Sequence, residues 1–275
     1  MTPLERGPHS RFFIPLLVAV LGITIGVGCV AALQPLESTS AARPTASAAA
    51  EDRPADQSAA LARPLSSRAI YARVEPSVVD VTATLRSSHE TASGTGFIIY
   101  LGAVYVLTNN HVIRDAAAVT VTIPATGRIY RARIVGLDAS ADIAVLQASS
   151  LPGLTAATLG DSARVTVGSA VVAIGNRAGA GGPPALAPGV ISGIGGTVEA
   201  SDGASKFTET LHGLLATTAR IEPGDSGGPL ADAAGAVIGV DTAAGTGGAE
   251  AGYAIPIDAA MAAVRQILGH AHLGI

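Results

Sequence analysis

The stretch Gly-Asp-Ser-Gly-Gly-Pro-Leu at Gly224–Leu230 constrains the fold of this chain more than any other. Apolar strand-like runs flank it at Leu211–Ile221 and Ala236–Ala243, so it predicts a tight connection between β-strands. Glycine has no Cβ and reaches backbone dihedrals that other residues avoid, so several N–H groups can point outward together. The stretch is therefore either a plain hairpin loop or a turn that presents the Ser226 hydroxyl and nearby N–H donors to a carbonyl group.

Short segments rich in Val, Ile and Thr, separated by Gly, Asp, Asn and Pro turns, are typical of an all-β barrel or sandwich. They form two series of about six, which predicts two six-stranded antiparallel β-barrels over about residues 69–160 and 161–256. A C-terminal helix is predicted over 257–268, where apolar residues recur on one face. The first series is Val78–Leu85, Gly96–Tyr100, Val104–Thr108, Ala118–Ile123, Tyr130–Leu137 and Ile143–Gln147. The second is Ala170–Ile174, Gly189–Gly193, Gly213–Thr218, Leu230, Val237–Thr242 and Gly252–Pro256.

Composition limits how such barrels are stabilised. Hydrophobic residues make up 48% of the 275 residues and aromatic residues only 3%, so Ala, Val, Ile and Leu must fill the core. Cys29 is the single cysteine, which rules out an internal disulfide. The net charge of −4 gives no sign of a nucleic-acid-binding surface.

Residues 12–33 are an uncharged apolar run, which as a helix would be about 33 Å long, enough to cross a hydrocarbon core of about 30 Å. A transmembrane anchor, with residues 1–11 in the cytoplasm, is the first interpretation. A signal peptide cleaved after Val30–Ala32 is the second. A lipoprotein signal ending at Cys29 is the third, and its sequence context fits poorly. All three place the rest of the chain outside the cytoplasm.

Residues 34–68 are rich in Ala, Ser, Pro, Arg and Thr and show no apolar periodicity. This composition cannot bury enough apolar surface to fold, so the segment is predicted to be a disordered linker. The folded domain then covers residues 69–275.

Two polar residues stand among the apolar segments of the first series. His111 follows the apolar run that ends at Thr108, where a single histidine is more often a hydrogen-bonded core residue than a catalyst. Asp142 begins the apolar segment up to Leu146. A buried carboxylate there needs hydrogen-bond donors, and an imidazole N–H is a natural one. The alternative is a cap at the start of the strand. Asp138 is the weaker candidate because it lies in a predicted turn.

The order His111, Asp142, Ser226 is the order found in one of the convergent Ser-His-Asp triads. Two barrels would place the histidine and the aspartate on the first and the serine on the second. The combination therefore predicts an active site between the barrels.

Over about residues 69–268 the chain resembles the trypsin-like serine proteases of the HtrA (high-temperature-requirement) type. The resemblance implies a chymotrypsin-like double barrel and a serine endopeptidase that needs no cofactor and no metal. The matching segments are Tyr71–Val79, Gly94–Ile99, Leu107–Ile113, Asp142–Leu146, Ala173–Asn176, Pro223–Leu230 and Gly252–Pro256.

The resemblance also implies roles. Ser226 would be the nucleophile, His111 the general base and acid, and Asp142 the group that fixes the imidazole tautomer. The N–H groups of Gly224 and Ser226 would form the oxyanion hole.

By the family's pattern, Ile221, Ala244 and Ala251 would line the primary substrate pocket. None of them is acidic, and Arg220 lies where an enzyme specific for basic residues would need a negative charge. We therefore predict cleavage after small or medium apolar residues.

Three features depart from the family's pattern. Only 49 residues follow Ser226 in the 275-residue chain, so no PDZ domain is expected. Asp225 stands where the family usually has Asn, and we expect it to pair with Arg220, Arg177 or loop N–H groups. Thr218 replaces the family's usual Asp near the specificity pocket.

The sequence thus predicts a serine endopeptidase outside the cytoplasm, acting on exported or misfolded proteins. Protein or peptide substrates are the expected partners, together with the membrane if residues 12–33 remain uncleaved; a secreted form is the alternative. A catalytically silent chaperone or binding module on the same fold is the second function considered, and an unrelated β-barrel binding protein the third. The oligomeric state is left open.

Overall fold

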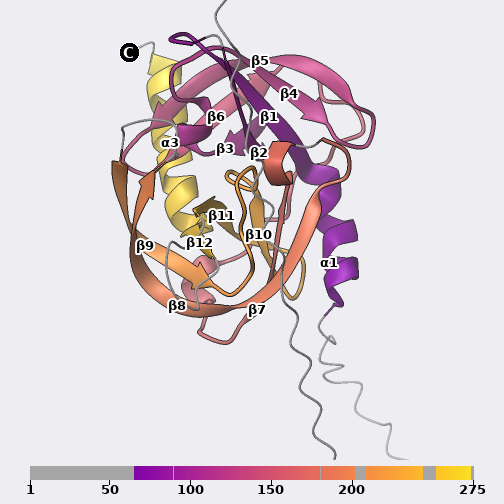
Figure 1. Cartoon of the computed structure of the whole chain (residues 1–275), viewed down its shortest axis with the longest axis vertical. Helices are drawn as coiled ribbons and strands as arrows, with labels where there is room; N and C mark the ends of the chain where they lie inside the picture. The colour runs from indigo at the N-terminus through magenta and orange to yellow at the C-terminus, as the bar shows by residue number, and fades with distance from the viewer. Residues whose placement is uncertain (1–64, 89, 180, 202–207, 244–251, 274–275) are drawn as a thin grey trace, which may run out of the picture. The chain divides into compact units, whose positions relative to one another are not determined.

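The structure, a computed structural model, describes residues 65–88, 90–179, 181–201, 208–243 and 252–273 (Figure 1). These residues belong to one compact unit that is mostly β-strand, as predicted. The predicted membrane or signal segment at 12–33 lies outside the described residues, as does the predicted linker up to residue 64. Among the described residues, no helix is both long enough and apolar enough to cross a membrane.

The first six strands form a closed antiparallel barrel in the order β1-β2-β3-β6-β5-β4, drawn in indigo to magenta in Figure 1. Five of the six predicted segments correspond to strands of similar extent, and β2 begins five residues earlier than Gly96. The strands are β1 (Val78–Leu85), β2 (Thr91–Tyr100), β3 (Val104–Thr108), β4 (Ala116–Ile123), β5 (Arg128–Asp138) and β6 (Ile143–Ala148).

The other six strands pair in the order β10-β11-β12-β9-β8-β7, and β7 pairs with β10 to close the second barrel. The predicted segment at Gly189–Gly193 lies within a strand over Ala185–Ser201. The one at Gly213–Thr218 overlaps a strand over Thr208–Thr217, and these two longer strands pair with each other. The strands are β7 (Ala170–Gly175), β8 (Ala185–Ser201), β9 (Thr208–Thr217), β10 (Pro229–Asp232), β11 (Val237–Ala243) and β12 (Gly252–Pro256).

Three α-helices accompany the strands in the described residues. Helix α1 (Ser67–Val74) is capped by the Ser66 side chain, which accepts a hydrogen bond from the Ala69 N–H at 3.3 Å, and it ends before the 3₁₀ turn that contains Pro76. Helix α2 (Asn110–Ile113) is a single turn directly after β3. Helix α3 (Ile257–Leu273) confirms the predicted C-terminal helix and continues past residue 268.

Buried apolar side chains form three clusters. One fills the first barrel and includes Val81, Ile98 and Leu146. Another fills the second barrel around Leu215 and Leu230. The third joins the two barrels and α3, with members that include Phe97, Leu107, Ile174, Val240 and Val264. Because the first four residues of β6 are all buried, they read as a continuous apolar run rather than as an alternating one.

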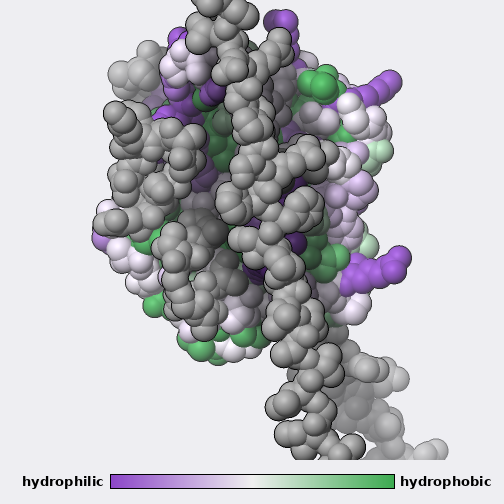
Figure 2. Space-filling view, viewed as in Figure 1, coloured by the Kyte–Doolittle hydropathy of each residue, from purple (hydrophilic) through white to green (hydrophobic). Residues whose placement is uncertain are grey.

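Helix α3 packs against β5 and β6 of the first barrel and against β11 and β12 of the second. In Figure 1 it runs, in yellow, along both groups of strands. On the uncovered part of the face in Figure 2, hydrophobic residues form small separate patches among polar ones. The cluster shared by the two barrels and α3 is the largest of the three buried apolar clusters.

Candidate active site

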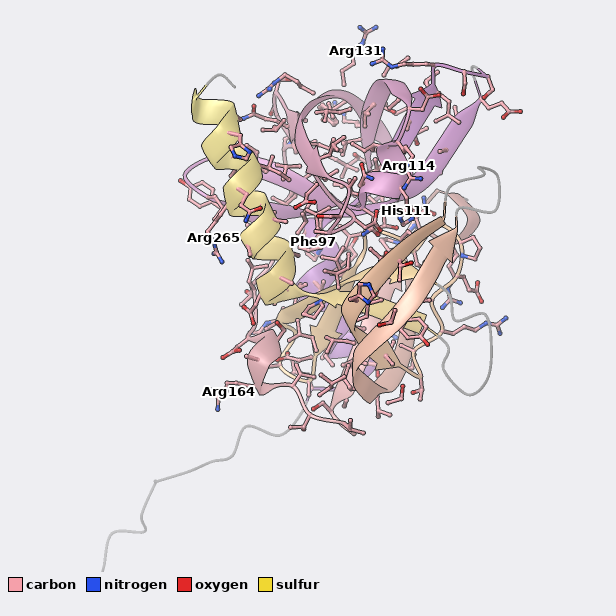
Figure 3. All side chains as sticks on the ribbon, turned by 90° about the vertical axis from the view of Figure 1, so that its left-hand side faces the viewer. Phe97, His111, Arg114, Arg131, Arg164 and Arg265 are labelled. Atoms are coloured by element: carbon pink, nitrogen blue, oxygen red, sulfur yellow. The ribbon has the colours of Figure 1, made fainter. Side chains whose placement is uncertain are left out.

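His111 and Asp142 are in direct contact. The His111 Nδ1 lies 2.8 Å from the Asp142 Oδ2, and the His111 backbone N–H donates to the Asp142 Oδ1 at 2.9 Å. His111 lies on α2, and its side chain is 18% exposed, whereas Asp142 is fully buried. Figure 3 shows His111 at the edge of the first barrel that faces the second. The imidazole is thus held through Nδ1, which leaves its other nitrogen for a reacting group.

The backbone around Asp142 explains the sequence Thr-Asn-Asn-His, which leads into the first residues of α2. The Asn109 side chain and the Asn110 N–H both donate to the Asp142 backbone oxygen, at 2.9 and 3.2 Å. Asp142 has a φ of 51°, a left-handed conformation that Asp tolerates better than most residues. Asp138 is predicted to lie in a turn, but it is the last residue of β5, where its side chain accepts hydrogen bonds from the Ser140 hydroxyl and the Ala141 N–H and so caps the turn that follows.

The loop that carries Ser226 is tied to the first barrel by Thr95 of β2. The Thr95 N–H donates to the Ser226 backbone oxygen at 2.8 Å, and its hydroxyl donates to the Gly224 oxygen at 2.7 Å. Gly227 has a φ of 87°, and a Cβ at this position would overlap the Thr95 oxygen and the Thr108 hydroxyl. Gly227 is therefore required because the loop passes against β2 and β3 at this position with no room for a side chain.

Thr242 of β11 links Ser226 to the His111–Asp142 pair. Its hydroxyl donates to the Asp142 Oδ2 at 2.8 Å, and its backbone oxygen accepts the Ser226 hydroxyl at 3.1 Å. Within the described part of the chain, no hydrogen bond joins Ser226 to His111. Ser226 is therefore connected to the His111–Asp142 pair through Thr242. Rotation of the Ser226 side chain about χ1 would turn its hydroxyl away from the Thr242 oxygen.

Asp225 is buried directly before the serine. Its Oδ2 accepts the Glu222 N–H at 2.9 Å and lies 3.6 Å from the Arg177 Nε. Arg220 pairs with Glu222 instead, at 2.8 Å. Burial raises the pKa of Asp225 above its usual value, and the Glu222 N–H and the Arg177 charge partly oppose that shift. Of the partners expected for Asp225, the structure shows Arg177 and the N–H of the loop residue Glu222, whereas Arg220 pairs with Glu222.

The predicted oxyanion-hole residues lie on this loop, where Gly224 has a φ of 99° that glycine adopts without strain. Of the predicted pocket residues, Ile221 is 2% exposed and packs in the second barrel's cluster. A Cβ on Gly252 would lie 2.5 Å from the Ile221 Cδ1, so these two residues are in close contact. Ala244 and Ala251 lie outside the described residues.

Sequence reasoning missed Thr95, Thr242 and Asp241 as parts of this site. A signal existed for two of them, because Asp241 and Thr242 are adjacent polar residues inside the apolar segment Val237–Ala243. Thr95 gave no comparable signal, since threonine is common in β-strands. Its role depends on the contact between barrels, which strand patterns do not reveal.

Fold and sequence comparison together define the class. Residues 94–240 match the family model of the trypsin-like peptidase domain, and the chain belongs to that family. The matched segment includes His111, Asp142 and Ser226 together with the loop tied to Thr95.

The relatives are HtrA-type serine proteases. A probable periplasmic serine protease of the do/HhoA-like type from Haemophilus influenzae is 37% identical over 178 residues, which cover 64% of this chain and 36% of that protein. Serine protease PepD of Mycobacterium tuberculosis is 32% identical over an alignment covering the whole chain and 64% of that protein. A structure of the HtrA-type protease AlgW with a tripeptide superposes with a TM-score of 0.62 at 33% identity, covering 75% of this chain and 64% of the other.

The resemblance to the HtrA type is thereby confirmed. The chain spans about a third of the length of the first curated relatives it matches. The expected lack of a PDZ domain stays a prediction.

Proposed function

We propose that the chain is a serine endopeptidase that hydrolyses peptide bonds through an acyl-enzyme formed on Ser226. One observation carries the proposal: the buried Asp142 holds the His111 Nδ1 at 2.8 Å, while Thr242 connects the same carboxylate to the serine. The membership in the trypsin-like peptidase family and the serine protease names of the relatives support it.

The chemistry follows from the roles these groups can take. The Ser226 Oγ turns from the Thr242 oxygen toward the His111 Nε2, which removes its proton as the oxygen attacks the substrate carbonyl. Asp142 keeps the proton on Nδ1 and stabilises the imidazolium. The N–H groups of Gly224 and Ser226 stabilise the negative oxygen of the tetrahedral intermediate. The imidazolium then protonates the leaving amine. In the second half of the reaction His111 removes a proton from water, which attacks the acyl-enzyme, and the proton returns to the Ser226 oxygen as it leaves.

The proposed substrates are exported or misfolded proteins, cleaved after small or medium apolar residues. The nonacidic Ile221 and the Arg220 beside it are the residues that favour this specificity over cleavage after Lys or Arg. The proposed location is outside the cytoplasm, either anchored through residues 12–33 or released after signal cleavage, and the word "periplasmic" in the relatives' names supports the compartment.

Labelling with a fluorophosphonate probe tests the proposal, because the probe reacts with an activated serine. We expect the full chain to be labelled, Ser226→Ala to lose the label and His111→Ala to be labelled poorly. Ser150→Ala is the matched control, since Ser150 is exposed on the surface of the domain and should keep full labelling. A folded wild-type chain without label would favour the noncatalytic binding module instead.

A further inference from the structure

Two buried carboxyl groups lie behind the nucleophile loop. Asp225 of the loop is 2% exposed and Asp241 of β11 is 0% exposed. The nucleophile loop is joined to Asp241 by two backbone hydrogen bonds, since the Gly227 N–H donates to the Asp241 oxygen at 2.7 Å and the Asp241 N–H donates to the Gly228 oxygen at 2.8 Å. The negative charge of Asp225 contributes, after burial, to raising the pKa of Asp241. The backbone pairing with Asp241 thus begins two residues after Asp225.

Most of their oxygen atoms lack a hydrogen-bond donor. Asp225 uses its Oδ2 for Glu222 and Arg177, whereas its Oδ1 and both oxygens of Asp241 have no hydrogen-bond partner among the described residues. Gly175 closes the space beside the Asp225 Oδ1, because a Cβ there would lie 2.6 Å from this oxygen. Burying carboxylate oxygens without hydrogen bonds costs free energy of folding, and the O–H of a protonated carboxyl group could supply the missing donor.

The surrounding charges suit one carboxylate and not two. Arg177 is the described cation that acts on Asp225, and nothing comparable acts on Asp241 in the described part of the chain. The other charged or titratable groups nearby are Glu222 of the same loop, Arg220 paired with Glu222, Asp80 of β1 beside Asn176, and the His111–Asp142 pair beyond Thr242. Two adjacent buried carboxyl groups with one cation hold a proton between them.

We propose that Asp225 and Asp241 share one proton, which Asp241 carries, and that this neutral acid positions the Gly224–Ser226 segment for catalysis. The proposal rests on the proposed function of the same site. Asp225 stays ionised and is held by Arg177 and the Glu222 N–H, while the Asp241 O–H donates to the Asp225 Oδ1. Asp241 is thus a positioning residue, which acts on the oxyanion-hole segment through Asp225.

The expected pH dependence has a definite sign. Burial raises the pKa of Asp241 well above its ordinary value, and the negative charge of Asp225 raises it further. The raised pKa makes Asp241, rather than Asp225, the carboxyl group that keeps the proton. As the pH rises through the raised pKa of Asp241, a second carboxylate forms beside Asp225, the two repel each other, and the loop loses its active arrangement. Activity must then fall on the alkaline side.

The test measures kcat and KM of the full chain against pH, with a peptide that carries Val before the scissile bond. Asp241→Asn keeps an N–H donor and cannot ionise. It should keep kcat within about twofold of wild type at neutral pH and lose the alkaline fall in activity. Asp241→Leu removes the donor and should lower kcat by about 10–100-fold, with little change in KM, because a misplaced oxyanion-hole donor acts mainly in the transition state. Asp161→Asn, an exposed carboxylate, is the matched control.

An infrared difference spectrum between wild type and Asp241→Asn provides a readout that does not depend on activity. We expect the wild type to show the band of a protonated carboxyl group at neutral pH and the variant to lack it. Absence of that band in the folded wild type would overturn the proposal of a shared proton. The proposal would also be overturned if Asp241→Asn lost activity at alkaline pH in the same way as wild type. Failure of the proposed function is separate, since it would appear as a wild-type chain that the fluorophosphonate does not label.

Discussion

At the scale of single residues, Thr242 is the group whose role is tested most directly. Its hydroxyl is one of three donors to the Asp142 carboxylate, beside the backbone N–H and the Nδ1 of His111. Thr242→Val removes one hydrogen bond to a buried charge while keeping the side chain's shape. We expect kcat/KM to fall by about 10-fold, which corresponds to about 1.4 kcal/mol, close to the lower end of the range for a hydrogen bond to a charged group.

Thr242→Ser is the matched control, because it keeps the hydroxyl and should keep kcat/KM within about twofold of wild type. Both variants retain the backbone oxygen that accepts the Ser226 hydroxyl. Equal activity of the Val and Ser variants would show that the hydroxyl is not needed to hold Asp142.

A second prediction for a single residue concerns stability and pH. Asp80 of β1 is 6% exposed and its Oδ1 has no hydrogen-bond partner among the described residues. Burial raises its pKa to about 6, and a hydrogen bond from Asn176 partly opposes the shift. Because the unfolded chain loses this proton near pH 4, the native state loses stability as pH rises from about 4 to about 6.

Asp80→Asn should abolish the loss of native-state stability with rising pH, because the amide does not ionise. We expect the variant to gain about 1–2 kcal/mol at pH 7, after allowance for partial solvent screening, and to differ little from wild type at pH 4. Urea unfolding at both pH values measures the difference. An equal effect at the two pH values would contradict a role for ionisation.

The sequence predicted the members of the candidate site better than their surroundings. His111, Asp142 and Ser226 stood out because each is a polar residue in an apolar or glycine-rich context. Thr242 did not stand out in the sequence. Its hydroxyl and backbone oxygen contact Asp142 and Ser226 only because the folded chain places β11 beside the first barrel. The chemistry of Asp241 depends in the same way on a neighbour sixteen positions away in the sequence.

At the scale of elements, hydrogen bonds from Thr95 hold β2 and the loop that carries Ser226 together. The Thr95 hydroxyl donates to the Gly224 oxygen and accepts the Asn176 N–H at 2.9 Å, so one side chain joins β2, the nucleophile loop and the residue after β7. Thr95→Val should leave the Gly224 peptide free to reorient. We expect kcat to fall by about 10–100-fold, as for the loss or misplacement of an oxyanion-hole donor.

Thr95→Ser keeps the hydroxyl and should keep most of kcat. The thermal unfolding midpoints of both variants show whether stability accounts for the result. If Thr95→Val matched wild type in kcat, the contact between β2 and the loop would be structural only.

Element patterns predicted strand positions well and strand lengths poorly. Segments such as Val78–Leu85 and Val104–Thr108 are bounded by turn residues and agree with β1 and β3. The strand β8 extends over 17 residues, through Gly189, Gly193 and Gly195, where pattern reasoning ended it early. Gly189 explains part of this, because its Cβ would overlap the Ala219 backbone, so glycine serves a close contact inside the strand rather than a turn.

At the scale of the whole domain, α3 is the element shared by both barrels. Ile267 lies on its buried face, is 7% exposed, and contacts β5 so closely that a Cβ on Gly136 would be 2.7 Å from its Cγ2. The same helix packs on β11 and β12 through the cluster that contains Val264. Because one apolar cluster includes residues of both barrels, loss of packing at one end of α3 should destabilise both.

Ile267→Ala should therefore lower the free energy of unfolding by about 2–4 kcal/mol, the usual cost of truncating a buried isoleucine. Hydrogen exchange should show peptides of β1 and of β11 losing protection together, since the barrels unfold as one cooperative unit. Arg265→Ala is the control, because Arg265 points away from the domain in Figure 3 and should change stability by less than about 0.5 kcal/mol. Loss of protection confined to β5 and β6 would contradict cooperative unfolding of the two barrels, because only the strands of the first barrel that contact α3 would then have been affected.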